Sequence, residues 1–240
     1  MVFRKCTIGG NAYRGDIESS HDDNAPMSDV EVPTDLAALG DTSADTRVQD
    51  ELKTKTPTDA ALEKFTDLAL QLDISEAFRN QNADFSATLI GFFTVLSLCH
   101  SVIAAKDPVT GKVEYKAQSP DEAALVKAAA EMGFEFLGKD KDILSLRTPA
   151  SADIERYELL DILDFTSARK RMSVVLRKLN QQDSSLLLLT KGADNIIFER
   201  LQPGADEMKT ETERHLSEFA NSGLRTLTLA YKTISGSSCF

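Results

Sequence analysis

Several residue types and motifs that mark whole classes of protein are missing from this sequence of 240 residues. It has no tryptophan, and its three cysteines, Cys6, Cys99 and Cys239, match no metal-binding spacing. An odd number of cysteines without a signal peptide fits a reducing compartment, so we expect free, buried thiols. The sequence also has no Gly-x-Ser-x-Gly elbow, no His-Glu-x-x-His helix and no Walker-type glycine loop, and a general hydrolase therefore finds no support.

Positive charge is scarce too, since the formal net charge is −11. This balance argues against nucleic-acid binding, and the cations Arg169, Lys170 and Arg171 are too few to reverse that interpretation. Most of the acidity lies in residues 14–64, which hold 13 acidic and 5 basic side chains. An anionic ligand could therefore bind away from that segment, because exposed charges are screened beyond about 8–10 Å.

Long apolar runs are rare as well. Residues 89–105, the one candidate for a membrane span, number about 17 and include Ser97, Cys99, His100 and Ser101. A spanning helix needs roughly 17–25 apolar residues, so this run is at the lower limit. We interpret it as part of a buried helix, with His100 hydrogen-bonded in the core and not a ligand; a membrane span is the alternative.

The hydrophobic pattern predicts an α+β fold, in which an antiparallel twisted sheet of about six or seven strands is flanked by helices. Strands are expected at residues 1–8, 112–117, 134–137, 143–147, 157–164, 171–178, 186–190 and 224–234, with a turn at residues 138–140 between the third and the fourth. Helices are expected at residues 60–72, 85–105, 120–132, 195–201 and 208–222. Asp194 is expected to cap the fourth of these helices, and Gly133 and Gly223 to end the third and fifth.

Residues 164–173 are the most informative stretch, because Phe165 precedes three cations between two strand-like runs. An aromatic ring can stack on a flat base, and cations can pair with phosphate. Phe165 and Lys170 would point to opposite faces of an unbroken strand, so we predict that residues 166–169 form a turn or bulge. Ser167 would lie in that break with its hydroxyl free. The alternative is a core phenylalanine beside a solvated basic hairpin.

Three further polar residues each have two interpretations. Glu122 follows Ser119 at capping-box spacing, so it either reaches back to that residue or faces a ligand. Lys191 ends a leucine-rich strand before Gly192, where another group could approach the backbone closely; a snorkelling lysine is the alternative. Arg225 could hold phosphate through two parallel hydrogen bonds or form a surface ion pair of little energetic weight.

Four segments together carry a resemblance to a known family: Gln118–Leu125, Phe165–Met172, Lys191–Asp194 and Gly223–Leu227. Their residues and order resemble the nucleotide-binding domain of P-type ATPases, specifically the phospholipid-transporting branch, the flippases. The resemblance covers residues 1–13 and about 85–234. One such motif would be weak, whereas four in the same order are specific.

The resemblance implies an ATP site. The residues that match its contacts are Glu122, Phe165, Ser167, Lys170, Lys191, Arg225 and Thr226. In this site Phe165 would stack on the base, and Glu122 would accept a hydrogen bond from the adenine amino group. Lys191 would line the adenosine pocket, and Arg225 would contact the phosphates.

The resemblance also divides the chain. Residues 1–13 would be a strand and linker from the missing phosphorylation domain, and 14–80 an acidic, partly mobile insertion with a helix near 60–72. Residues 81–234 would be the nucleotide-binding core and 235–240 a tail. The remaining phosphorylation, actuator and membrane domains of a parent ATPase would be its partners, with the chain at the cytosolic face of a membrane; an isolated fragment would be soluble in the cytoplasm.

The chain contains neither the family's Asp-Lys-Thr-Gly-Thr segment, which carries the phosphorylated aspartate, nor its magnesium-binding Gly-Asp-Gly segment. Phosphoryl transfer needs a nucleophile and a metal, so we expect ATP binding without turnover by this chain alone. Mg²⁺ would act in a full-length relative, with no site here. The alternative function is a truncated, non-catalytic interaction protein that retains the fold.

Overall fold

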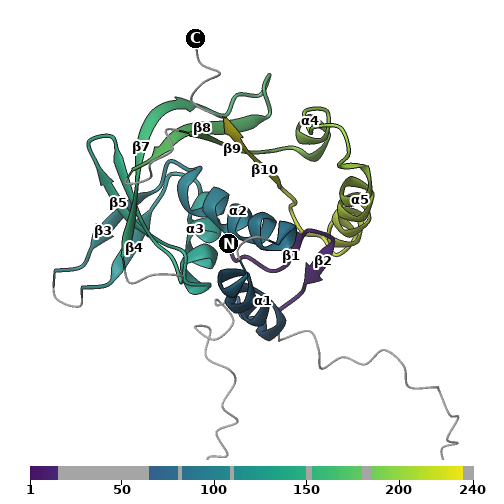
Figure 1. Cartoon of the computed structure of the whole chain (residues 1–240), viewed down its shortest axis with the longest axis horizontal. Coiled ribbons are helices and arrows are strands. Elements are labelled where there is room, and N and C mark those ends of the chain that lie inside the picture. Colours follow the sequence, from purple (N-terminus) through teal and green to yellow (C-terminus); the bar gives the residue numbers. More distant parts are fainter. Residues whose placement is uncertain (16–64, 81–82, 109–110, 150–152, 180–184, 235–240) are drawn as a thin grey trace, which may run out of the picture.

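The fold is built on a six-stranded antiparallel sheet with the strand order β10-β9-β8-β7-β6-β5 (Figure 1). The structure is a computed structural model, and it describes residues 1–15, 65–80, 83–108, 111–149, 153–179 and 185–234. The strands are β5 (Glu135–Asp140), β6 (Ile143–Arg147), β7 (Ile154–Leu163), β8 (Arg171–Lys178), β9 (Leu186–Gly192) and β10 (Thr228–Ile234). The predicted α+β class with an antiparallel sheet and flanking helices is confirmed.

Two small sheets and five helices complete the described part of the chain. The sheets pair β1 (Cys6–Ile8) with β2 (Asn11–Tyr13), and β3 (Ile103–Lys106) with β4 (Val113–Lys116). The helices are α1 (Leu68–Arg79), α2 (Asp84–Leu98), α3 (Pro120–Glu131), α4 (Asp194–Phe198) and α5 (Asp206–Asn221). In Figure 1, α2 lies inside the curve of the sheet, where it packs against β9 and β10, and α1 and α3 pack against α2.

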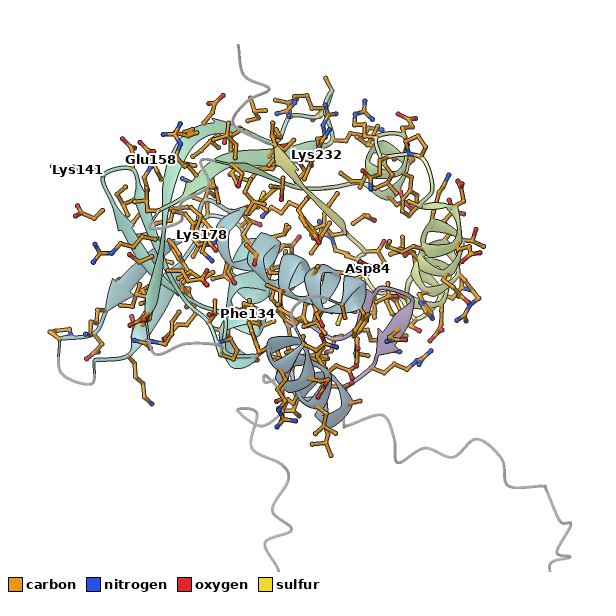
Figure 2. All side chains as sticks on the ribbon, viewed as in Figure 1. Asp84, Phe134, Lys141, Glu158, Lys178 and Lys232 are labelled. Carbon is orange, nitrogen blue, oxygen red and sulfur yellow. The ribbon has the colours of Figure 1, made fainter. Side chains whose placement is uncertain are left out.

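The core fills the space between α2 and the sheet. Phe93 of α2 and Phe134, which precedes β5, stack with their ring centroids 4.9 Å apart. Phe134 lies between the helices and the strands in Figure 2. The β1–β2 hairpin joins the same core through Cys6, Ile8 and Tyr13, all of which are buried. Burial of large apolar side chains of this kind contributes about 1.5–3 kcal/mol each.

Helix α1 lies further along the chain than the sequence pattern predicted. Asp67 is its N-cap, with the carboxylate accepting a hydrogen bond from the Leu70 amide at 2.9 Å. The helix expected near residues 60–72 therefore begins at Leu68 and continues to Arg79, while residues 60–64 lie outside the described part. Ile74 and its buried neighbours on α1 belong to the hydrophobic core, so this helix packs with the domain although it falls in the range expected to be an insertion.

The long helix expected at residues 85–105 was predicted wrongly at its end. Helix α2 stops at Leu98, and residues 103–106 form a strand that pairs with β4. A short apolar run does not distinguish helix from strand by periodicity alone, which is why the pattern failed here. Among the described residues, no helix has both the length and the apolar character needed to cross a membrane.

Two smaller predictions were also wrong. The turn expected at residues 138–140 is part of β5: the register against β6 shifts at a bulge between Phe136 and Gly138, and the strand continues to Asp140. Asp194 does not cap α4 but is its first residue, with Ala193 at the cap position. In contrast, Gly133 and Gly223 follow α3 and α5 with φ of 90° and 74°, the left-handed conformation expected after a helix end.

His100 lies between α2 and β3 and is a buried core residue, as predicted. Its Nε2 lies 2.8 Å from the Ser97 carbonyl oxygen, and its Nδ1 accepts a hydrogen bond from the Val102 amide at 3.1 Å. These two contacts require the neutral tautomer that carries its proton on Nε2.

Of the cysteines, Cys6 and Cys99 are buried and free, and Cys239 lies outside the described residues.

Acidification is expected to destabilise the chain through His100. Burial lowers the pKa of His100 to about 4. Unfolded His100 gains its proton near pH 6.5, so folding stability is complete above that pH and is lost progressively as pH falls to about 4, by about 3 kcal/mol in all. An NMR titration of the imidazole should give a midpoint near 4. A midpoint near 6.5 would contradict the expectation, and urea unfolding of His100→Asn at pH 7 and 4.5 provides the control.

Candidate functional site

The candidate site begins at the N-terminus of α3. Pro120 occupies the first helical turn, and the Ser119 side chain makes no capping hydrogen bond. The Glu122 carboxylate instead contacts Lys191 Nζ at 2.6 Å and accepts hydrogen bonds from the Ser101 hydroxyl at 2.5 Å and the Ser101 amide at 3.2 Å. The capping-box interpretation of Glu122 is therefore wrong, and a contact of Glu122 with a ligand stays a prediction.

The Glu122–Lys191 pair is largely withdrawn from solvent. The Lys191 side chain is 10% exposed and the Glu122 side chain 15%. Burial alone would raise the pKa of the Glu122 carboxyl, but the hydrogen bonds from Lys191 and Ser101 outweigh it and hold that pKa below its ordinary value. Glu122 is therefore ionised at neutral pH, and Lys191 is not a snorkelling surface lysine.

The predicted break in the β7–β8 pair is present. β7 ends at Leu163 and β8 begins at Arg171. Between them the Lys170 amide donates to the Thr166 carbonyl oxygen at 2.7 Å, and Lys170 itself has a φ of 50°. This left-handed conformation is uncommon for a residue other than glycine, and it turns the chain so that the residues before β8 do not continue the strand alternation.

Phe165 lies in this turn with its side chain in solvent. It is 62% exposed, and Ser167 and Lys170 are exposed as well. The alternative interpretation, a core phenylalanine beside a solvated hairpin, is therefore wrong. An exposed phenylalanine has lost little water contact on folding, so its ring is free to stack on a ligand.

Gly192 brings this turn against the end of β9. A Cβ atom at Gly192 would lie 2.6 Å from both the Lys170 carbonyl oxygen and Arg171 Cβ. The Ala193 amide donates to that same carbonyl oxygen at 3.1 Å. The predicted close approach at Gly192 is thus present, and the group that approaches is the backbone of the turn that carries Phe165 and Lys170.

Arg225 closes the arrangement from the loop between α5 and β10. Its guanidinium contacts the Asp121 carboxylate at 2.9 Å, beside Glu122 at the start of α3. Arg225 and its neighbour Thr226 are exposed. The ion pair is a surface one, worth about 0–1 kcal/mol, so a phosphate group could replace Asp121 at little cost.

These contacts link four distant segments into one region. Lys170 touches Gly192, Lys191 binds Glu122, and Arg225 binds the residue beside Glu122. Phe165 and Ser167 share the turn of Lys170, and Thr226 adjoins Arg225. The sequence analysis did not identify two contact partners in this region: Ser101, which contacts Glu122, and Asp121, which contacts Arg225. Asp121 lies within a motif that the sequence does display, whereas no local signal marks Ser101.

The sequence of this region matches a known family model. Residues 88–239 match the model described as P-type ATPase, cytoplasmic domain N. The chain belongs to this family. Across the described ranges of this N domain, no three His, Cys, Asp or Glu side chains gather as a metal site built only from protein ligands would require.

Individual relatives extend this result. The N domain is 47% identical over 153 residues to the probable phospholipid-transporting ATPase 11 of Arabidopsis thaliana, which covers 62% of this chain and 12% of that protein. It is 37% identical over 242 residues to the probable phospholipid-transporting ATPase 12 of the same plant, covering 98% of this chain and 19% of the relative. The phospholipid-transporting ATPase dnf2 of Schizosaccharomyces pombe is 48% identical over 144 residues, 60% of this chain and 10% of the relative. The chain therefore spans a tenth to a fifth of these relatives.

Proposed function

We propose that this N domain is the ATP-binding module of a phospholipid-translocating P-type ATPase, located at the cytosolic face of a membrane. Adenosine binds against Phe165, with Lys191 and Glu122 beside it and Ser167, Lys170, Arg225 and Thr226 nearer the phosphates. The γ-phosphate is delivered to an aspartate on the phosphorylation domain, and the actuator and membrane domains are the other partners.

One observation carries the proposal: residues from α3, the β7–β8 turn, β9 and the loop before β10 meet around a buried ion pair with an exposed aromatic ring nearby. The pair supplies both an acceptor for an amino group and a cation, and the ring supplies a flat surface. Arg225 and Lys170 add exposed positive charge to the site in a chain whose net charge is −11, and exposed charges further away than about 8–10 Å are largely screened.

Phe165→Ala is expected to weaken ATP binding about fivefold to a hundredfold without loss of stability. Stacking of a base on an aromatic ring is worth roughly 1–3 kcal/mol, and the exposed ring contributes little to the core. Isothermal titration with ATP measures the effect. Leu72→Ala is the matched control, because Leu72 on α1 is also 62% exposed but lies outside the site.

Equal ATP affinity of Phe165→Ala and the parent chain would refute the stacking role. No saturable ATP binding at all would favour the other candidate, a non-catalytic interaction protein that keeps this fold. The titration is repeated with and without Mg²⁺, together with a phosphate-release assay. We expect little effect of the metal and no hydrolysis, since phosphoryl transfer needs groups that the described residues do not supply.

A further inference from the structure

A cavity of about 440 Å³ lies beneath the β3–β4 hairpin, on the side of the sheet covered by α2. Its wall is mainly apolar: Leu98 comes from the end of α2, Ile103 from β3, and Leu159, Ile162 and Val174 from the sheet. None of the seven residues assigned to ATP lines it. We call this space the hairpin cavity; its volume is within the usual range of about 300–1,000 Å³ for small-molecule sites.

The charged residues of the hairpin cavity are all of one sign. Lys139 and Lys141 line it, and none of the described Asp or Glu residues does. Lys141 lies at the tip of the β5–β6 hairpin (Figure 2), has a φ of 53° and forms no ion pair with any residue that the structure describes. Among the described residues, Lys139 forms an ion pair only with Asp142, whose exposed carboxylate lies 3.7 Å away. Two lysines thus border an apolar space without a buried counter-charge.

Besides His100, the described side chains of the wall include one neutral hydrogen-bonding group, the Ser101 hydroxyl, which donates to Glu122 at 2.5 Å. His100, also in the wall, has both ring nitrogens occupied by backbone partners. A ligand with many polar groups would therefore leave most of them without a hydrogen-bond partner, which opposes binding. A ligand with one acidic group and an apolar body would not.

We propose that the hairpin cavity binds a small organic anion, with its apolar body between β3 and the sheet and its acidic group at Lys139 and Lys141. This site is distinct from the proposed ATP site and does not depend on it. The two are neighbours through Ser101, which borders the cavity and contacts Glu122.

The fluorescent probe 8-anilinonaphthalene-1-sulfonate, an apolar ring system with one sulfonate, tests the proposal. We expect saturable binding of one probe per chain. Ile103 is 69% exposed at the cavity wall, so Ile103→Glu and Ile103→Gln are both compatible with folding. The two side chains have nearly the same shape, and only the carboxylate repels the sulfonate. We expect the Kd of Ile103→Glu to be about fivefold higher than that of Ile103→Gln.

A second comparison removes the lysines. Lys139→Ala/Lys141→Ala is expected to raise the probe Kd about fivefold, whereas Lys232→Ala, on β10 and outside the cavity wall (Figure 2), should leave it unchanged. Far-UV circular dichroism checks that each variant is folded. The absence of saturable binding, an equal Kd for the two Ile103 variants, or an equal effect of Lys232→Ala would each overturn the proposal.

ATP provides the last distinction. Suppose that ATP displaces the probe fully and that Lys139→Ala/Lys141→Ala also binds ATP more weakly. The hairpin cavity would then be part of the ATP site, and the proposal of a separate site would be overturned. Failure of Phe165→Ala to alter ATP binding bears only on the proposed function, because Phe165 does not line the hairpin cavity.

Discussion

A Lys191→Met variant is expected to unfold with about 2–3 kcal/mol less free energy than the parent chain at pH 7. Methionine keeps the length of the side chain and removes only the ammonium group, which lies 2.6 Å from Glu122 Oε1. Removing one partner of a buried ion pair typically costs about 3–5 kcal/mol, because a charge is left without compensation. The cost here is smaller, since Ser101 still donates two hydrogen bonds to Glu122.

The loss of stability in Lys191→Met should depend on pH with a defined sign. In the parent chain the pKa of Glu122 is held below its ordinary value. The ionised carboxylate therefore stabilises the fold at any pH above that ordinary pKa, and this contribution is lost as the pH falls through the lower pKa of the folded state. In the variant, burial acts against a weaker set of hydrogen bonds and raises that pKa. The ionised carboxylate then opposes folding at pH 7, and its protonation as the pH falls removes that penalty.

Urea unfolding of the parent chain and Lys191→Met at pH 7 and pH 4 measures this difference. We expect the gap in free energy of unfolding to shrink to under about 1 kcal/mol at pH 4. Glu122→Gln/Lys191→Met should recover most of the loss at pH 7, because no charge is then buried alone. A gap that stays constant with pH would show that the ammonium group does not stabilise Glu122.

The double variant also separates stability from ligand binding. If Lys191 and Glu122 contact the nucleotide, the folded Glu122→Gln/Lys191→Met chain should bind ATP at least tenfold more weakly than the parent, about 1.4 kcal/mol. Parent-like affinity in a chain of restored stability would remove both residues from the proposed site.

Local patterns predicted well those helices and strands whose extent is marked by a clear local signal. The predicted ranges of β6 and β8 coincide with the observed Ile143–Arg147 and Arg171–Lys178, and α3 begins at Pro120 as expected. Alternation of apolar residues and a proline at the first helical position are both local signals. Strand β10 was predicted to start four residues early, because the loop at Leu224 is as apolar as the strand that follows.

The errors have long-range causes. Helix α2 ends at Leu98, and residues 103–106 form a strand that pairs with β4. A run of apolar residues gives no local signal of that pairing. Gly138 was predicted to lie in a turn, but it pairs with Ser145 of β6, directly after the bulge that follows Phe136, and the strand continues. In both cases tertiary pairing overrode a local preference.

Local patterns likewise predicted one part of the candidate site and could not predict the rest. The turn at residues 166–169 followed from side-chain alternation, since Phe165 and Lys170 could not otherwise share a region. That Glu122 contacts Lys191, 69 positions away, did not follow from any local pattern; only the resemblance placed both at one site. Ser101 carries no motif, so its hydrogen bonds to Glu122 could be found only in the folded chain.

Gly192→Ala is expected to lower the free energy of unfolding by about 1–3 kcal/mol and to weaken ATP binding about tenfold or more. The φ of Gly192 is not in the left-handed region, so the cost comes from space alone. The added methyl group would lie 2.6 Å from the Lys170 carbonyl oxygen and 2.9 Å from Arg171 Cα, and these are backbone atoms that cannot rotate away. The turn must shift, and Phe165 and Lys170 shift with it.

Gly204→Ala separates this local effect from a general loss of stability. Gly204 has a φ of 94°, and a methyl group added there would have no atom within 4 Å, so alanine is strained at this position but displaces nothing. It should cost about 1 kcal/mol and leave ATP affinity unchanged. Urea unfolding and ATP titration of both variants give the comparison. If Gly192→Ala bound ATP as tightly as Gly204→Ala, the packing of the turn on β9 would have no part in holding the nucleotide.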